Sequence, residues 1–186
     1  MPSYIPDPSK RLGAQYARVG ATSQYFEISG ARSVVEKLSA NQANGEEVAR
    51  SLKAQGFSGC WVIALGTNDT ADVYAGSQVG LSARIKKMMS VIGDEPVMWE
   101  TVKSLLTSGP YAEANMRTWN RTVIRACDKY PNMRVFDWAS AADDGWFISD
   151  GTHYTSEGYT QRARLTADAL VHAFPTSGSS HGCVVD

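Results

Sequence analysis

The sequence predicts an α/β fold built around a parallel β-sheet. Its strongest strand signal is the run GCWVIAL at residues 59–65, which is apolar without alternation and suits a strand buried on both faces. Segments of this kind alternate along the chain with segments of helical periodicity, as in βαβ units. The sequence contains neither an internal repeat nor a dividing linker. We therefore expect one domain over residues 1–174, followed by a C-terminal tail over residues 175–186.

The first part of the chain is expected to hold, in order, a helix over 7–19, a strand over 24–29 and helices over 33–40 and 46–55. Asp7 can cap the first helix, and Pro8 suits its first position, where a missing N–H costs nothing. The strand, QYFEIS, alternates in polarity and ends at Gly30. The pair Asn44-Gly45 separates the two helices predicted at 33–40 and 46–55.

After residue 58 we expect strands over 59–65, 96–102 and 133–138, and helices over 81–92, 111–130 and 155–173. The helix at 111–130 is amphipathic, which indicates that one of its faces packs on the sheet.

Composition excludes several classes of partner. Apolar residues make up 43% of the 186 residues and charged residues 20%, as in ordinary globular proteins. The net charge of −1 predicts neither a nucleic-acid partner nor an anionic membrane surface. No apolar run approaches the roughly 18 residues of a membrane helix. The start, MPSYIPDPSKR, lacks the apolar stretch of a signal peptide.

The three cysteines, Cys60, Cys127 and Cys183, allow two interpretations. No CxxC or Cys/His spacing suggests a metal site, and the acidic residues at 143, 144 and 150 have no further ligands nearby, so we expect no metal. The cysteines are either three unrelated thiols, or Cys127 and Cys183 form a disulfide that ties the tail to a helix in an exported protein.

The first candidate motif is Gly-Thr-Asn-Asp at residues 66–69, directly after the predicted strand at 59–65. Ligands of parallel α/β sheets bind just beyond the carboxyl ends of strands. The amide N–H groups of Asn68 could point into that crevice and stabilise a developing oxyanion. The segment also suits a turn, because Asn-Asp after Gly is ordinary turn chemistry.

The second candidate motif is Asp-Gly-Thr-His at residues 150–153, just before the last predicted helix. The spacing lets the carboxylate of Asp150 accept a hydrogen bond from one imidazole nitrogen of His153. The other nitrogen is then free to act as a general base. The alternative is a helix cap, with Thr155 or Ser156 at the start of the helix.

The two motifs, in this order and each after its own strand, resemble the SGNH (GDSL-like) hydrolases. Residues 66–69 match the family's third block, Gly-x-Asn-Asp, and residues 150–153 match its fifth, Asp-x-x-His, within DGTHYTSEGY. Gly30 in ISGARS is the match for the glycine of the second block. The resemblance covers nearly the full length of the chain.

The resemblance implies a role for each matched residue. Asn68 and Gly30 would form the oxyanion hole, His153 would be the base, and Asp150 would orient it. It also implies a flavodoxin-like three-layer αβα sandwich with strand order 2-1-3-4-5, in which the four predicted strands would be the second to the fifth.

The family's first block, a Gly-Asp-Ser at the end of the first strand, is absent from the sequence. Nothing upstream of Ser3 could form a strand, and Ser33 is better interpreted as a helix start, so neither is expected to be the nucleophile. The chain is therefore expected to lack its first strand and to begin a few residues after the nucleophilic serine. Met1 would then be an internal methionine or the edge of a fragment.

The stretches VIALGTND, NMRVFDWAS and GWFISDGTHYTSEGY resemble actinobacterial SGNH domains at the C-termini of membrane acyltransferases. This implies an extracytoplasmic or secreted serine esterase or O-acyltransferase, tethered to such a membrane domain. Its substrates would be small acyl esters of glycans or glycolipids, and it would need no cofactor. Trp146 would line the acyl or sugar pocket, or pack under the loop.

A different class of function stays open. If Met1 is the true start, the chain would be cytoplasmic and would lack a nucleophile. It would then be a non-catalytic SGNH-like module that binds acylated sugars, or an inactive truncated product.

Overall fold

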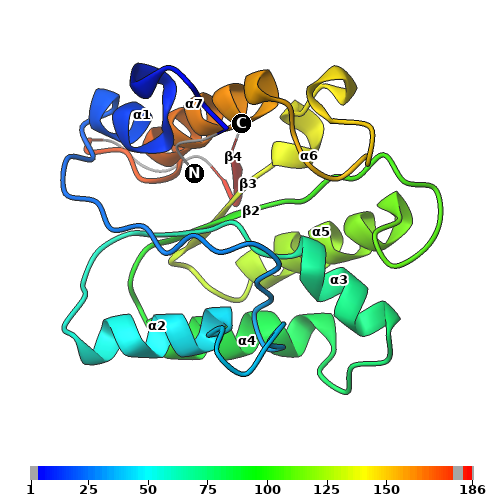
Figure 1. Ribbon diagram of the computed structural model, residues 1–186. Coiled ribbons are helices and arrows are strands. Elements are labelled where there is room, and N and C mark those ends of the chain that lie inside the picture. Colours follow the sequence, from blue (N-terminus) through cyan, green and yellow to red (C-terminus); the bar gives the residue numbers. More distant parts are fainter. Residues whose placement is uncertain (1–3, 178–181, 186) are drawn as a thin grey trace.

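The computed structural model describes residues 4–177 and 182–185. Within them, a parallel sheet lies between two layers of helices (Figure 1). Its strands, in spatial order, are β1 (Trp61–Ile63), β2 (Val97–Glu100), β3 (Met133–Phe136) and β4 (Val184–Val185). The α/β fold with a parallel sheet is thereby confirmed.

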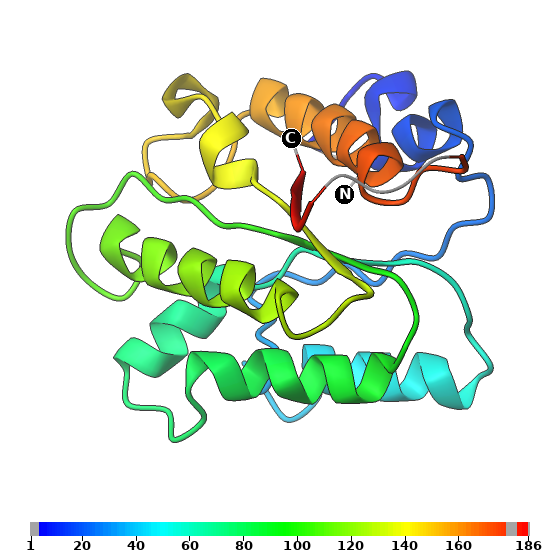
Figure 2. The ribbon, with the colours of Figure 1, turned by 180° about the vertical axis from the view of Figure 1, so that it is seen from behind.

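The helices fall on the two faces of the sheet. One layer holds α1 (Leu12–Arg18), α6 (Trp138–Ala141) and α7 (Ser156–Ala173), and the other holds α2 (Gly45–Ala54), α3 (Thr67–Tyr74), α4 (Leu81–Ile92) and α5 (Glu113–Cys127) (Figures 1 and 2). Two short 3₁₀ helices, η1 (Pro8–Lys10) and η2 (Asp144–Trp146), precede α1 and α7. Helix α1 packs on α7, and α4 packs between α2 and α5.

Local signals in the sequence explain where several helices begin. Asp7 accepts a hydrogen bond from the N–H of Ser9, with Pro8 at the first position of η1. Asn44 and Glu47 form a reciprocal capping box at the start of α2, which satisfies two otherwise unpaired backbone donors. The helices predicted at 46–55, 81–92, 111–130 and 155–173 are confirmed, each within a few residues of its expected ends.

The central strands are buried on both faces. Along β2, Val97 and Trp99 contribute to the apolar core under α2, α4 and α5, whereas Met98 belongs to the core under α7. This alternation follows from the two-residue period of a strand. Both cores exclude water from the ladder, which explains why this strand has no polar face until Glu100.

Two predicted elements near the N-terminus are wrong. Residues 24–29 form no strand, and residues 33–40 form bends and irregular chain instead of a helix. The side chains of Tyr25, Phe26 and Ile28 are exposed. In the described sheet β1 is an edge strand, and no strand occupies the place of the family's first strand between it and residues 24–29. Without that neighbour the QYFEIS segment has no ladder to join.

Among the described residues, the sheet thus matches a flavodoxin-like sandwich without its first strand and, because residues 24–29 form no strand, also without the expected second one. β1, β2 and β3 occupy the places of the third, fourth and fifth strands, and β4 extends the far edge. Helix α3 begins at Thr67, within the first candidate motif, where the sequence analysis predicted no helix.

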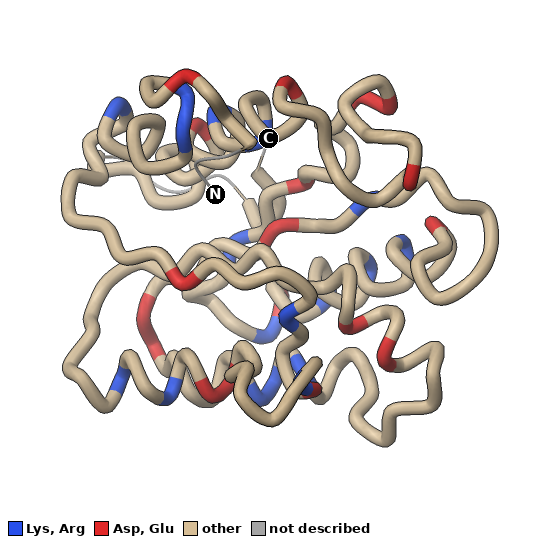
Figure 3. Tube along the Cα trace, viewed as in Figure 1, with Lys and Arg blue, Asp and Glu red and all other residues tan. Residues whose placement is uncertain are grey.

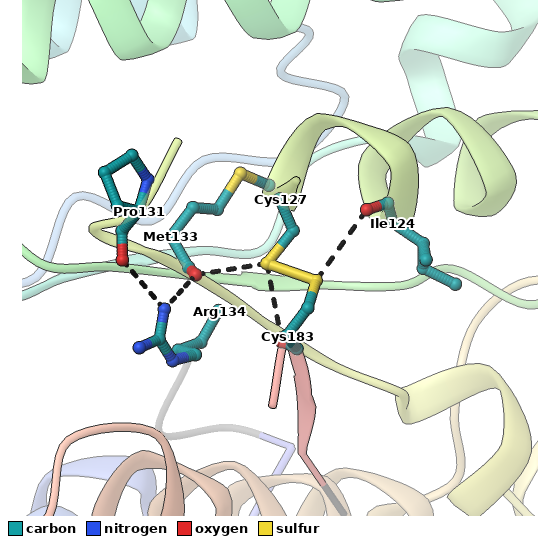
Figure 4. The surroundings of a disulfide bond; sticks show 6 residues. All are labelled: Ile124, Cys127, Pro131, Met133, Arg134 and Cys183. Atoms are coloured by element: carbon teal, nitrogen blue, oxygen red, sulfur yellow. Dashed lines mark hydrogen bonds between the residues drawn. A yellow bond between two sulfur atoms is a disulfide. The ribbon is translucent and has the colours of Figure 1, made fainter. Parts of the chain in front are cut away.

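A disulfide holds the C-terminal segment against the sheet. Cys127, at the end of α5, is bonded to Cys183, with their Cα atoms 5.9 Å apart (Figure 4). Residues 184 and 185, within the predicted tail, form β4 beside β3. The predicted Cys127–Cys183 pairing is confirmed, and the interpretation of three unrelated thiols is wrong; export of the protein stays a prediction. Cys60 is free.

Charge is distributed evenly over the molecule. Lys and Arg residues are interspersed with Asp and Glu in both helical layers (Figure 3). Among the described residues, no helix has the length and apolar composition needed to cross a membrane.

Candidate active site

The loops that carry both motifs lie at the carboxyl edge of the sheet. The start of α3 follows β1, the segment before α5 follows β2, and the connection from α6 to α7 follows β3, all toward the right of Figure 1. In open parallel sheets this edge is where ligands bind.

Asp150 and His153 form a hydrogen-bonded pair. Asp150 Oδ2 lies 2.8 Å from His153 Nδ1, and Oδ1 accepts the backbone N–H groups of His153 at 2.9 Å and of Thr152 at 2.8 Å. These bonds, above all that from the His153 N–H, lower the pKa of Asp150 to about 2. The carboxylate is therefore ionised at neutral pH and can orient the imidazole. The His153 side chain is 69% exposed, which leaves Nε2 accessible from solvent.

Backbone hydrogen bonds fix the loop that carries this pair. The N–H of Ile148 donates to the carbonyl of His153 at 2.9 Å, and the N–H of Thr155 donates to the carbonyl of Trp146 at 2.8 Å. Thr155 also accepts the N–H of Gly158 and so caps α7. The predicted cap and the predicted Asp–His pair are both present, formed by different residues.

Trp146 lies beneath this loop. Its ring stacks on Trp138 with centroids 5.9 Å apart, and the Arg162 guanidinium lies over Trp138 and Tyr154 at 5.6 and 5.5 Å. Gly158 is required here, because a Cβ at this position would lie 2.5 Å from the Trp146 carbonyl oxygen. These contacts give Trp146 a packing role, and its contact with substrate stays a prediction.

Asn68 lies in the first turn of α3. The chain enters this helix through Gly66, whose φ of +152° favours glycine and whose Cβ would lie 2.2 Å from Trp119 Nε1. The amide oxygen Oδ1 of Asn68 lies 3.3 Å from the hydroxyl of Tyr111, which donates to it. The Nδ2 group of Asn68 carries the donors that an oxyanion would need.

Asp69, the last residue of the first motif, is fully buried and acts in the scaffold. Its Oδ1 accepts the backbone N–H of Val34 and pairs with Arg84 Nη1, each at 2.9 Å. Burial raises its pKa to about 6, against the opposing effects of these two donors.

Arg84 also pairs with Glu36 and lies 3.5 Å from Asp72. The carboxylates of Glu36, Asp69 and Asp72 are close enough together to hold a metal ion, but the Arg84 guanidinium already lies among them. The cluster ties the irregular segment at 33–36 to α3 and α4.

The segment 104–113 connects the surroundings of the two motifs, and sequence reasoning missed it. Ser104 Oγ and the N–H of Leu105 both donate to the carbonyl of Gly151, at 3.2 and 2.8 Å, next to the Asp–His pair. Its other end carries Tyr111, which reaches Asn68. An open groove of about 630 Å³ runs along this segment, lined in part by Leu105, Leu106 and Arg117.

Gly30 is exposed, and its carbonyl accepts a hydrogen bond from Gln42. Among the described residues it makes no hydrogen bond to Asn68 or to the Asp–His pair, so its oxyanion role stays a prediction. Ser33 is buried and donates to Asp72. This supports the expectation that it is not a nucleophile, and Ser3 lies outside the described residues.

No protein-family model matches the chain, and no curated protein matches it. Among solved structures the chain is similar to Est24, described as a carbohydrate acetylesterase from Sinorhizobium meliloti. The TM-score is 0.64 at 16% sequence identity, over 89% of this chain and 86% of that one. At this low identity the similarity shows a shared fold alone, which supports the fold expected from the resemblance to SGNH hydrolases.

Proposed function

We propose that this chain forms part of a serine esterase that cleaves small acyl esters of glycans. The observation that carries the proposal is the Asp150–His153 pair: a carboxylate held ionised, bonded to Nδ1, with Nε2 open to solvent at the carboxyl edge of the sheet. The shared fold with a carbohydrate acetylesterase supports the choice of ester chemistry.

In this proposal the nucleophile is a serine on a segment that precedes Met1. That segment pairs with the edge of β1 to which no described strand is bonded. His153 Nε2 takes the hydroxyl proton as the serine oxygen bonds to the acyl carbon. The Asn68 Nδ2 group and the Gly30 N–H donate to the oxyanion. The alkoxy group leaves with the proton from His153, and water then releases the acyl group from the serine by the same route.

The proposal includes two further possibilities: transfer of the acyl group to an alcohol instead of water, and action on acyl esters of glycolipids. We also propose that the protein is located outside the cytoplasm, where it is tethered to a membrane acyltransferase domain. The Cys127–Cys183 disulfide supports the location, because disulfides persist in oxidising compartments.

A second candidate is a module that binds acylated sugars without cleaving them, or an inactive product. It is favoured by one observation: no Gly-Asp-Ser occurs among the 186 residues.

The experiment compares hydrolysis of p-nitrophenyl acetate by the 186-residue chain and by the same reading frame extended upstream. We expect turnover in the extended protein and its loss by at least about 10³-fold in His153→Ala and Asp150→Asn. The matched control is His172→Gln, in the last turn of α7, which should retain activity. Equal turnover in His153→Ala would refute the esterase proposal. A stop codon directly upstream would favour the binding module.

A further inference from the structure

We infer that Tyr111 is a positioning residue that fixes the rotation of the Asn68 amide so that its N–H groups face the reacting ester. The inference rests on the proposed function. Tyr111 lies between β2 and α5, far from both motifs in the sequence, and its hydroxyl lies 3.3 Å from Asn68 Oδ1.

The chemistry of the two groups gives the contact its direction. The phenol O–H is a donor, and an amide offers one acceptor oxygen and one N–H₂ group on opposite sides. When the oxygen of Asn68 accepts from Tyr111, the Nδ2 group must point the other way. A rotation of 180° would instead turn the oxygen toward a developing oxyanion and repel it. One donor on the oxygen therefore selects the productive orientation.

Hydrogen bonds on both sides of Tyr111 hold its backbone in place. Just after it, the N–H of Glu113 donates to the Leu106 carbonyl at 2.8 Å, and the Glu113 carboxylate accepts the N–H of Ser104 at 2.9 Å. The two residues just before Tyr111, at 109 and 110, accept hydrogen bonds at their carbonyl oxygens from Asn115 Nδ2, each at 3.1 Å. The same segment bonds Gly151 beside the Asp–His pair. It therefore positions the donor of the oxyanion hole and the base relative to each other.

The first test uses the extended protein and Tyr111→Phe, which removes only the hydroxyl. We expect kcat to fall about 10- to 100-fold, less than the 10²- to 10³-fold typical of deleting an oxyanion donor. KM should stay within twofold and Tm within about 2 °C. Asn68→Ala should lose more activity, and adding Tyr111→Phe to it should change nothing further. Tyr74→Phe, on the exposed end of α3, is the matched control and should behave as the wild type.

A second measurement is independent of turnover and uses the 186-residue chain. In ¹⁵N-labelled protein, Tyr111→Phe should shift or broaden the Asn68 side-chain N–H₂ signals, and Tyr74→Phe should leave them in place. Unchanged Asn68 signals in Tyr111→Phe, or a kcat equal to that of the wild type while Asn68→Ala is impaired, would overturn the inference. If Asn68→Ala and His153→Ala both keep full turnover, the proposed esterase function fails, and the NMR result still decides the contact.

Discussion

At position 66 the backbone passes directly against the indole of Trp119. A Cβ there would meet three ring atoms at 2.2 to 2.7 Å, and the φ of +152° is one that side chains rarely adopt. The glycine of the Gly-Thr-Asn-Asp motif is thus explained by packing, and the asparagine two residues later owes its position to this close approach. The aspartate that ends the motif is explained by its bonds to Val34 and Arg84.

Gly66→Ala is therefore expected to destabilise the protein by more than about 3 kcal/mol, because it adds overpacking to backbone strain. Gly76→Ala is the matched control: its φ is +96°, but nothing lies within 4 Å of the added Cβ. The control should lose only about 1–2 kcal/mol. Urea unfolding of both variants checks the difference, and equal losses would contradict a clash with Trp119.

At the scale of elements, β4 is the least self-sufficient part of the sheet. It has two residues, and the adjoining Cys183 carbonyl accepts the N–H of Val135 at 2.9 Å, while the Val185 carbonyl accepts that of Asp137 at 3.3 Å. The disulfide to α5 holds this short strand in register, with Cys127 Sγ 3.1 Å from the Met133 carbonyl oxygen (Figure 4). A strand so short depends on a covalent tie to stay in the ladder.

Reduction of the disulfide should lower the free energy of unfolding by about 2–4 kcal/mol, because the bond restricts the unfolded chain over a separation of 56 residues. Amide hydrogen exchange at Val135 and Asp137 should accelerate more than exchange elsewhere in the sheet. Urea unfolding and exchange measured with and without dithiothreitol check both effects. The Cys60→Ser variant should show the same difference between the two conditions, whereas Cys183→Ser should show none.

At the scale of the whole molecule, buried ionic groups link segments that are far apart in the sequence. Arg84 joins the irregular segment at 33–36 to α3 and α4 on one face of the sheet. On the other face, Glu100 of β2 accepts from Arg162 and Thr166 of α7. Both clusters set how a helical layer sits on the sheet, so they help to place the carboxyl edge.

Asp69 gives stability a pH dependence with a defined sign. Its folded pKa of about 6 lies above the ordinary aspartate value of 3.8, so the folded protein binds the proton more tightly than the unfolded chain. Its contribution to stability must therefore fall as the pH rises from about 4 to about 6. We expect the wild type to lose roughly 1–3 kcal/mol over this range relative to Asp69→Asn, which cannot titrate there.

Urea unfolding of both proteins at several pH values between 4 and 7 checks this prediction. Asp150 does not affect the comparison in this pH range. Its lowered pKa changes the stability only below about pH 4, and there the stability falls as the pH falls. Parallel stability curves for the two proteins would contradict a raised pKa at Asp69.

The sequence by itself determined the features that depend on neighbours along the chain. The apolar run at 59–65 indicated a buried strand, Asn44-Gly45 marked the start of α2, and the spacing of Asp150 and His153 was sufficient for their pairing. Such features follow from the periods of helices and strands and from the short reach of side chains.

Only the tertiary structure decided what depends on contacts between distant segments. The alternation in QYFEIS was a valid strand pattern, but a strand needs a neighbour, and the described sheet offers none beside it. The Val-Val pair near the C-terminus carried almost no pattern, yet β3 and the disulfide make it a strand. The contact of Tyr111 with Asn68 joins residues 43 apart, and no local rule could reveal it, because it exists only where the sheet brings two loops to the same edge.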